Sequence, residues 1–239
     1  MTQKTERAVS IDFFALSGTG KSTHSKALLK HLSDQGFKAE ILSFSARRSG
    51  KNGSFGKPQR LLASKLFQSF RLGGSLWKLL PKNKSLSKLA FLMKWSYRAI
   101  TYNQKLRTQG VKGRDFVILD PSLSSKLKNF YKHFSDNTMV EVIALLEQNN
   151  LTSDVIVILE ADMKIVKQRR GARGSEETAK GDKATIPIAK AFHEFCKRKT
   201  SMYVVTVDYD SFSNLNNNIQ QITQVCTLAK SKLETKNTG

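Results

Sequence analysis

The sequence predicts an α/β protein in which a five-stranded, mostly parallel sheet carries helices on both faces. Three observations support this prediction. Short apolar runs alternate along the chain with segments of helical periodicity. The runs are almost continuously apolar, which is typical of strands buried on both faces of a sheet. The first run also leads through a glycine-rich loop directly into a helical segment. The chain of 239 residues is expected to form a single domain, 1–239.

The predicted strands are short and apolar. They are expected at about 8–14, 38–44, 115–119, 155–159 and 203–207. Helical periodicity fills most of the intervals between them. A glycine, Gly36, follows the first helix, and Pro81 separates two long helices. Helices are predicted at about 25–32, 59–80, 85–109, 124–134, 138–148 and 215–233, and another extends to about residue 199 after a polar, charged stretch at 168–185.

Basic residues are unusually frequent and unevenly distributed. The chain has 40 Lys and Arg against 19 Asp and Glu, a formal net charge of +21. Residues 41–114 contain no acidic side chain and 17 basic ones. Such a segment attracts polyanions, which include nucleic acid, an anionic membrane surface and a highly phosphorylated substrate. The alternative is a surface charge that only keeps the protein soluble. Apolar residues at helical spacing within this segment are expected to form core faces, with membrane or single-stranded nucleic-acid contact as the alternatives.

Cysteine and histidine usage narrows the class of protein. The two cysteines, Cys196 and Cys226, are too few for the disulfide framework of a small secreted domain, which favours a cytoplasmic protein with reduced thiols. No apolar run is long enough to span a bilayer. The four histidines show no metal-ligand spacing with Cys, Asp or Glu, so they are expected at the surface or in ordinary packing.

The glycine-rich loop reads Ala-Leu-Ser-Gly-Thr-Gly-Lys-Ser-Thr at residues 15–23. A strand, a glycine-rich turn and a helix in this order direct backbone N–H groups and the positive end of the helix at phosphate oxygens. The Lys21 ammonium reaches the transferring phosphate, and the Ser22 hydroxyl is placed to bind magnesium. The alternative is a helix start whose glycines serve only the turn. The nucleotide-binding residues are predicted to be Gly18, Thr19, Gly20, Lys21, Ser22 and Thr23.

Several further strings follow this loop in an order that resembles the thymidylate kinase group of P-loop nucleotide kinases. The resemblance covers most of the chain. Its landmarks after the loop are Arg47 to Gly50 with Arg60-Leu61-Leu62, then Arg98, then Asp120 with Ser124-Ser125, then Arg169-Arg170-Gly171-Ala172-Arg173-Gly174, and finally Val205 to Asp208.

This resemblance implies a P-loop kinase fold, with an acceptor-binding helical region at about 45–110 and a lid at about 164–186. It implies ATP and Mg²⁺ as cofactors and phosphoryl transfer to a phosphorylated small molecule, by default thymidylate (dTMP to dTDP). A homodimer and polyanion contact through 41–114 are further expectations. The implied roles are transfer catalysis for Lys21, Arg169, Arg170 and Arg173, magnesium binding for Ser22 and Asp120, and acceptor binding for Arg47, Arg60, Arg98 and Asp120. The alternatives are a capping role for Asp120 and ordinary surface positions for the arginines.

The sequence departs from the family pattern at substrate-facing positions. Phe14 and Ser17 stand where the family has carboxylates, Pro121 replaces an arginine, and Ala15 replaces the first glycine of the loop. Ile100 stands where a glutamine reads the thymine edge, and an isoleucine cannot hydrogen-bond a base. Two alternatives therefore stay open. One is a kinase for a different phosphorylated metabolite. The other is a kinase-like nucleotide-binding protein whose basic segment binds nucleic acid or an anionic membrane.

Overall fold

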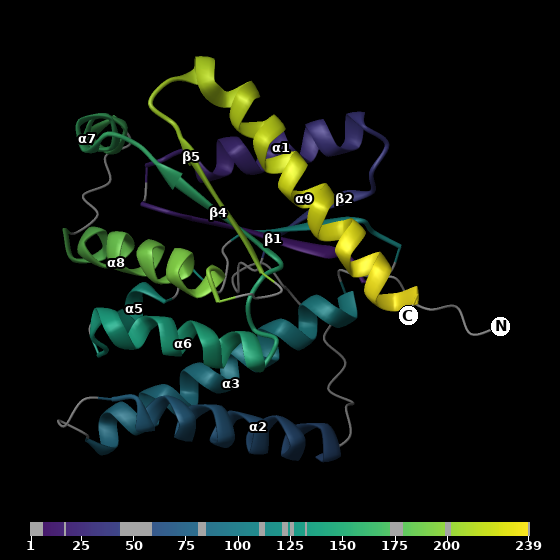
Figure 1. Cartoon of the computed structure of the whole chain (residues 1–239). Coiled ribbons are helices and arrows are strands. Elements are labelled where there is room, and N and C mark those ends of the chain that lie inside the picture. The colour runs from purple at the N-terminus through teal and green to yellow at the C-terminus, as the bar shows by residue number, and fades with distance from the viewer. Residues whose placement is uncertain are drawn as a thin grey trace, which may run out of the picture.

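A parallel β-sheet organises the chain, as Figure 1 shows. The computed structural model describes residues 7–16, 18–43, 59–80, 85–109, 113–120, 124, 127–131, 133–172, 179–198 and 202–238. The strands are β1 (Val9–Ala15), β2 (Ala39–Ser43), β3 (Phe116–Asp120), β4 (Val155–Glu160) and β5 (Tyr203–Asp208). Their order is β2-β3-β1-β4-β5, and every pairing is parallel. The carboxyl end of the central strand β1 therefore lies between those of β3 and β4. Open α/β folds bind their ligands at the carboxyl ends of the strands.

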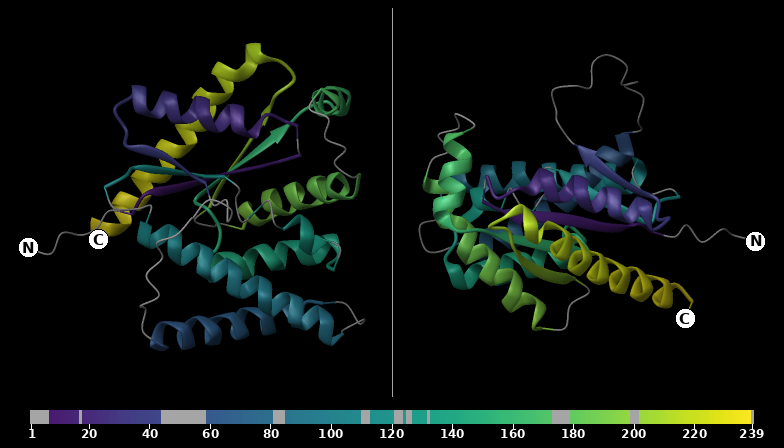
Figure 2. Two further views of the ribbon diagram at one scale, coloured as in Figure 1. Left: turned by 180° about the vertical axis from the view of Figure 1, so that it is seen from behind. Right: turned by 90° about the horizontal axis from the view of Figure 1, so that it is seen from above.

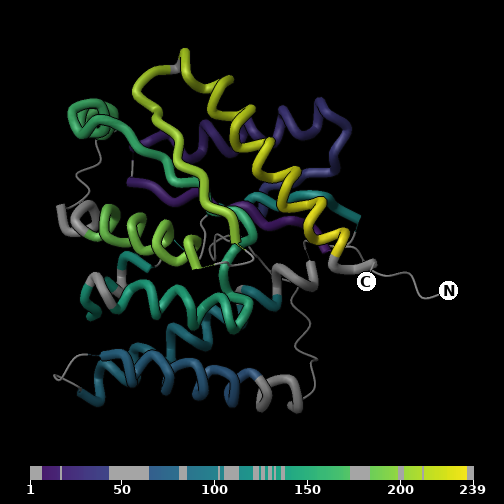
Figure 3. Tube along the Cα trace, viewed as in Figure 1, coloured from purple at the N-terminus to yellow at the C-terminus, as the bar shows by residue number. Residues whose placement is uncertain are grey.

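Helices cover both faces of the sheet (Figures 1 and 2). On one face lie α1 and α9. On the other lie α6 and α8, with α3 and then α2 stacked beyond them, so that α2 is the outermost layer. The chain passes from the end of β4 directly into α7 (Figure 3). The bounds are α1 Lys21–Asp34, α2 Gln59–Lys78, α3 Leu86–Gln109, α5 Lys128–Tyr131, α6 Asp136–Gln148, α7 Met163–Gly171, α8 Ala179–Cys196, the 3₁₀ turn η1 Phe212–Asn214 and α9 Leu215–Thr238.

Alternate side chains of β1 enter two separate hydrophobic clusters, because successive residues of a strand point to opposite faces. Ile11 and Phe13 pack with side chains of α1 and α9, among them Leu28 and Ile222. Phe14 points to the other face and packs with the helices there. That second cluster also contains Leu72, Leu76, Leu92, Trp95, Ile100, Leu127, Val142, Ile188 and Phe192. The central strand is thus buried from both sides, and the position of the loop that follows it is fixed by the core.

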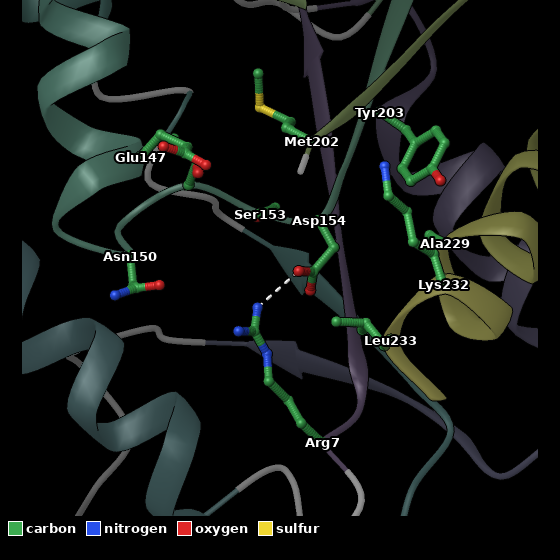
Figure 4. Close-up of a pocket in the computed structure, with 11 residues that line it drawn as sticks. Arg7, Glu147, Asn150, Ser153, Asp154, Met202, Tyr203, Ala229, Lys232 and Leu233 are labelled. Carbon is green, nitrogen blue, oxygen red and sulfur yellow. Dashed lines mark hydrogen bonds and ion pairs between the residues drawn. The ribbon is translucent and has the colours of Figure 1, made fainter. Parts of the chain in front are cut away.

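A polar cluster around Asp154 joins the amino end of β1 to that of β4, and Figure 4 shows Asp154 with Arg7. Asp154, just before β4, accepts hydrogen bonds from the Ser10 backbone N–H at 2.8 Å and the Ser10 hydroxyl at 2.6 Å. It also pairs with the Arg7 guanidinium at 2.6 Å. Arg7 and Asp154 border a cavity of about 230 Å³ that is also lined by Tyr203 and Lys232. The polar contacts of Asp154 thus join β1 to the start of β4.

The predicted fold class is confirmed, with the sheet entirely parallel among the described strands. Of the helix expected at 124–134, the structure shows Ser124 in helical conformation and a helical turn, α5, at Lys128–Tyr131, whereas 125, 126 and 132 lie outside the described residues. The Ser124 hydroxyl binds Asp12. Helix α8 begins at Ala179, well inside the stretch expected to be polar and irregular, and it holds Pro187 in its interior. Burial of Ala184 and Ile188 on either side of this proline stabilises the helix there.

None of the helices that the structure describes combines the length and the apolar character needed to cross a lipid bilayer.

Candidate phosphate-binding site

The glycine-rich loop connects the end of β1 to the start of α1. Gly18 and Gly20 have φ angles of 86° and 89°, in the left-handed region where glycine is favoured because it has no Cβ. Gly20 is the N-cap of α1, and the Thr19 side chain hydrogen-bonds to the Leu16 carbonyl. The turn therefore points the amino end of α1, the positive end of its dipole, into the mouth of the loop. Ser17 lies outside the described residues.

Lys21 folds back over this loop. Its Nζ donates to the Ala15 carbonyl at 3.1 Å and to the Leu16 carbonyl at 3.0 Å. Ser22 follows on the first turn of α1 and is exposed, whereas Thr23 is half-buried. A lysine ammonium and a helix amino end at one point create a positive potential suited to an anion. The loop thus has the electrostatics of a phosphate-binding site.

Helix α7 packs directly on the loop through Arg170. This arginine is 8% exposed, although arginine is seldom so deeply buried. A Cβ added at Gly18 would lie 3.2 Å from Arg170 Cγ and 3.3 Å from the Val166 carbonyl oxygen. Gly18 therefore serves two purposes, since it permits the turn and leaves room for α7. Arg173, the third arginine of this string, lies outside the described residues.

The neighbouring Arg169 reaches the turn after β5. Its guanidinium lies 4.7 Å from the centre of the Tyr209 ring and donates to the carbonyls of Tyr209 at 3.2 Å and Asp210 at 3.3 Å. Tyr209 in turn lies against the loop, because a Cβ added at Gly20 would be 2.5 Å from Tyr209 Cε1. The structure thus brings Lys21, Arg169 and Arg170 around one loop, together with a tyrosine that sequence reasoning missed.

Beneath the loop lies a buried histidine, His24. Its Nδ1 is 3.1 Å from the Gly20 carbonyl oxygen, which can only accept, so Nδ1 carries the proton. Its Nε2 is 3.4 Å from the Asn218 amide nitrogen, which also donates to the Asp208 carbonyl at 2.7 Å. The ring stands edge-on to Tyr209, 4.4 Å between centres. Burial lowers the pKa of His24, and the nearby Arg169 charge lowers it further, against the opposing effect of the Gly20 carbonyl.

This histidine makes the stability of the fold depend on pH. The pKa of His24 lies below 6.5 in the folded protein and near 6.5 in the unfolded chain. Between these two values the unfolded chain binds a proton that the folded protein does not. The free energy of unfolding should therefore fall as the pH decreases below about 6.5. Urea unfolding of wild type and His24→Gln at several pH values tests this, and an equally steep loss of stability on acidification in both proteins would contradict it.

Asp120 and Ser22 were predicted to hold magnesium. Asp120 is half-buried at the carboxyl end of β3, the strand beside β1, and Ser22 opens the first turn after the loop. No group of three or more His, Cys, Asp and Glu side chains with metal-binding geometry occurs in the described part of the chain. Mg²⁺ in phosphate sites, however, is held mainly by phosphate and water oxygens with one or two protein ligands. A hydroxyl on the first turn of α1 and a carboxylate at the end of the strand beside β1 fit that mode chemically.

The positions that the resemblance assigns to acceptor binding are less polar here than in the family pattern. Phe14 and Ile100, which replace a carboxylate and a glutamine, are both buried in the same hydrophobic cluster, together with Leu127. Arg98 is exposed on α3. Arg60 lies within α2, but its side chain is outside the described part of the structure, and Arg47 and Pro121 lie outside it altogether.

Two further polar residues near the loop were not predicted as site residues. Asp12, fully buried on β1, accepts hydrogen bonds from the Ser124 backbone N–H at 3.3 Å and from the Ser124 hydroxyl. Lys128, at the start of α5, donates to the Ala15 carbonyl at 2.8 Å. A carboxylate in an apolar strand was a usable signal for Asp12, because such groups are seldom buried without partners. Lys128 gave no such signal, since it lies among other basic residues.

Comparison with known proteins adds two distant structural likenesses. No family model and no curated protein matches the sequence. Deoxyadenosine kinase from M. mycoides, solved with bound dATP, is 19% identical with a TM-score of 0.42, over 90% of this chain and 97% of that one. Thymidylate kinase from Candida albicans is 17% identical with a TM-score of 0.44, over 97% of this chain and 93% of that one. These values transfer neither a site nor a substrate, and the site is interpreted from its own geometry.

Proposed function

We propose that the protein is an ATP- and magnesium-dependent phosphotransferase that phosphorylates a small molecule already carrying a phosphate. The observation that carries the proposal is the loop after β1, in which two left-handed glycines, the amino end of α1 and the Lys21 ammonium converge. Arg169 and Arg170 add positive charge around it. Phosphoryl transfer needs little beyond positioning and charge neutralisation, which such an arrangement supplies.

In this proposal each residue binds or orients. Lys21 turns from the loop carbonyls to the donor's β- and γ-phosphate oxygens, where its hydrogen bonds become charge-assisted. Backbone N–H groups at 18–22 hold the phosphates. Arg169, Arg170 and Arg173 neutralise charge on the transferring group, and Arg47, Arg60 and Arg98 hold the acceptor phosphate. Ser22 and Asp120 would hold Mg²⁺, which neutralises phosphate charge when bound. The cytoplasmic location and the homodimer likewise stay predictions.

Thymidylate remains the default acceptor of the resemblance, but the burial of Phe14 and Ile100 supports a different phosphorylated metabolite. Neither side chain can hydrogen-bond, and both are enclosed in one apolar cluster. Without a polar contact at these positions, a thymine ring loses the discrimination that a paired amide supplies, which is often several orders of magnitude.

A screen of acceptors tests the proposal. Purified protein is incubated with labelled ATP and magnesium against nucleoside monophosphates, other phosphorylated metabolites and oligonucleotides. We expect label to enter one class of small phosphorylated acceptor and Lys21→Ala to slow the transfer by about a hundredfold or more. Binding of ATP with no acceptor labelled would refute the enzymatic function.

A second candidate function is contact with a polyanion through the basic segment, and one observation favours it. Phe67 and Phe70 on the outermost helix α2 are 70% and 60% exposed, and the basic residues Arg71 and Lys78 of the same helix are exposed as well. Other apolar residues of the basic segment 41–114 do form core faces as expected, since Leu72, Leu76, Leu92 and Trp95 are buried. Binding to single-stranded nucleic acid or anionic vesicles should weaken steeply with salt and be reduced in Phe67→Ser/Phe70→Ser. Absence of salt-dependent binding would exclude this function.

A further inference from the structure

We propose that Lys128 is a second phosphate-binding lysine that acts beside Lys21 at the terminal phosphate of the donor. This inference rests on the proposed function and assigns a residue to it. The Lys128 ammonium donates to the Ala15 carbonyl at 2.8 Å, and the Lys21 ammonium donates to the same oxygen at 3.1 Å. Two lysines from distant parts of the chain thus meet at one atom, the last carbonyl of β1.

Their meeting point indicates the charge of the ligand. Two ammonium nitrogens bound to one carbonyl oxygen lie within about 6 Å of each other, where like charges repel. The amino end of α1, Arg169 and Arg170 lie around the same loop. A ligand with several negative charges close together relieves this repulsion, and a polyphosphate chain is such a ligand. A singly charged anion would offset only part of this repulsion.

Contacts with β1 and with Phe14 hold Lys128 in position at the loop. Its ammonium lies 5.7 Å from the centre of the Phe14 ring, which packs edge-on against Phe192 at 5.6 Å. The segment before it is attached to β1, because Asp12 accepts from both the backbone and the hydroxyl of Ser124. The Ser124 carbonyl then accepts from the Leu127 N–H at 3.0 Å. The buried carboxylate of Asp12 thus helps to hold the start of α5 at the loop. Binding of a ligand to Lys128 therefore costs little additional conformational entropy.

Lys128 lies on the side of the loop that Lys21 reaches. Since Lys21 is assigned to the β- and γ-phosphates, a cation that shares its carbonyl partner faces the same end of the donor. Phosphate oxygens bind an ammonium more strongly than a neutral carbonyl does, because the hydrogen bond is charge-assisted. Lys128 is therefore expected to contribute to ATP binding more than to ADP binding. A lysine that only satisfied the Ala15 carbonyl would not distinguish the two nucleotides.

Calorimetric titration with MgATP and MgADP tests the assignment. The variants are Lys128→Met, which keeps an unbranched stem over Phe14, and Lys128→Arg, which keeps the charge. The matched control is Lys190→Met, an exposed lysine on α8. We expect Lys128→Met to weaken ATP binding about tenfold or more, as loss of a charged hydrogen bond does, and to weaken ADP binding less. Lys128→Arg should remain within about threefold of wild type and Lys190→Met should be unchanged.

Three results would overturn the assignment. Wild-type ATP affinity in Lys128→Met, with Lys21→Ala defective, would reject Lys128 and leave the proposed function standing. Equal losses of ATP and ADP affinity would show that Lys128 only supports the loop. Failure of wild type to bind ATP would reject both proposals. If Lys128→Met does not fold, Lys128→Gln gives the same comparison, because its uncharged amide can still donate to a carbonyl.

Discussion

Replacing Lys21 with alanine is expected to lower kcat by about a hundredfold to a thousandfold, the effect of removing one preorganised group that stabilises transition-state charge. Lys21 is the side chain whose ammonium lies on the loop itself, held by the Ala15 and Leu16 carbonyls. As the phosphoryl group transfers, charge shifts among its oxygens and those of the donor. A fixed ammonium at that point stabilises the transition state more than the bound donor, so its removal should reduce kcat as well as affinity.

Steady-state kinetics with the acceptor found in the screen provide the measurement. Lys26→Ala is the matched control, because Lys26 lies on the same helix and is exposed. This control should retain wild-type turnover and show that loss of one positive charge on α1 is not sufficient. The assignment of Lys21 fails if Lys21→Ala, folded as judged by circular dichroism, keeps more than about a tenth of the wild-type kcat.

Gly20→Ala is expected to lower the free energy of unfolding by about 3 kcal/mol and to abolish nucleotide binding. Two physical effects contribute. The φ angle of 89° places any Cβ in the left-handed region, which costs about 1 kcal/mol. The added methyl would also lie 2.5 Å from Tyr209 Cε1, and relieving such an overlap in a packed site costs about 1–3 kcal/mol. Because Tyr209 is itself held beneath Arg169, the loop would have to move.

Gly36→Ala separates these two effects. Gly36 has a φ angle of 85°, and nothing lies within 4 Å of a Cβ built there. Urea unfolding should therefore show only the backbone effect of about 1 kcal/mol for this variant. In the Gly20→Ala background, Tyr209→Leu should restore part of the lost stability, because it removes the ring that the methyl meets. Equal destabilisation by the two glycine substitutions would contradict the packing of Tyr209 on the loop.

The parts of this fold that could be predicted from sequence are those specified by local patterns. Continuous apolar runs identified the strands. Helical periodicity predicted α1 from about residue 25, whereas the helix begins at Lys21, directly after Gly20. The beginning of α8 could not be predicted in this way. A helix that starts near residue 186 would place Pro187 in its first turn, where proline is well tolerated. The structure instead begins α8 at Ala179, and packing of Ala184, Ile188 and Phe192 against the sheet outweighs the effect of the proline.

Some residues of the candidate site could likewise be predicted from local sequence patterns, and others could not. The loop residues 18–23 could be identified because their spacing in the chain determines their geometry. Tyr209 and Lys128 could not, since one approaches the loop from the end of β5 and the other from α5. Their roles depend on which strands flank β1, and a sequence without its strand order does not reveal this. His24 had no recognisable spacing either, and its burial under Gly20 follows from the contact of α1 with α9 and Tyr209.

The measurement that most directly tests the central claim is the amount of ADP formed per molecule of acceptor phosphorylated. A phosphotransferase with this site should form ADP only when an acceptor is present, in a ratio of about one to one, because such enzymes exclude water from the transferring group. Lys21→Ala should form both products about a hundredfold to a thousandfold more slowly. Formation of ADP without an acceptor, or ATP binding with no ADP formed under any condition, would contradict the claim that the loop after β1 serves phosphoryl transfer between two small molecules.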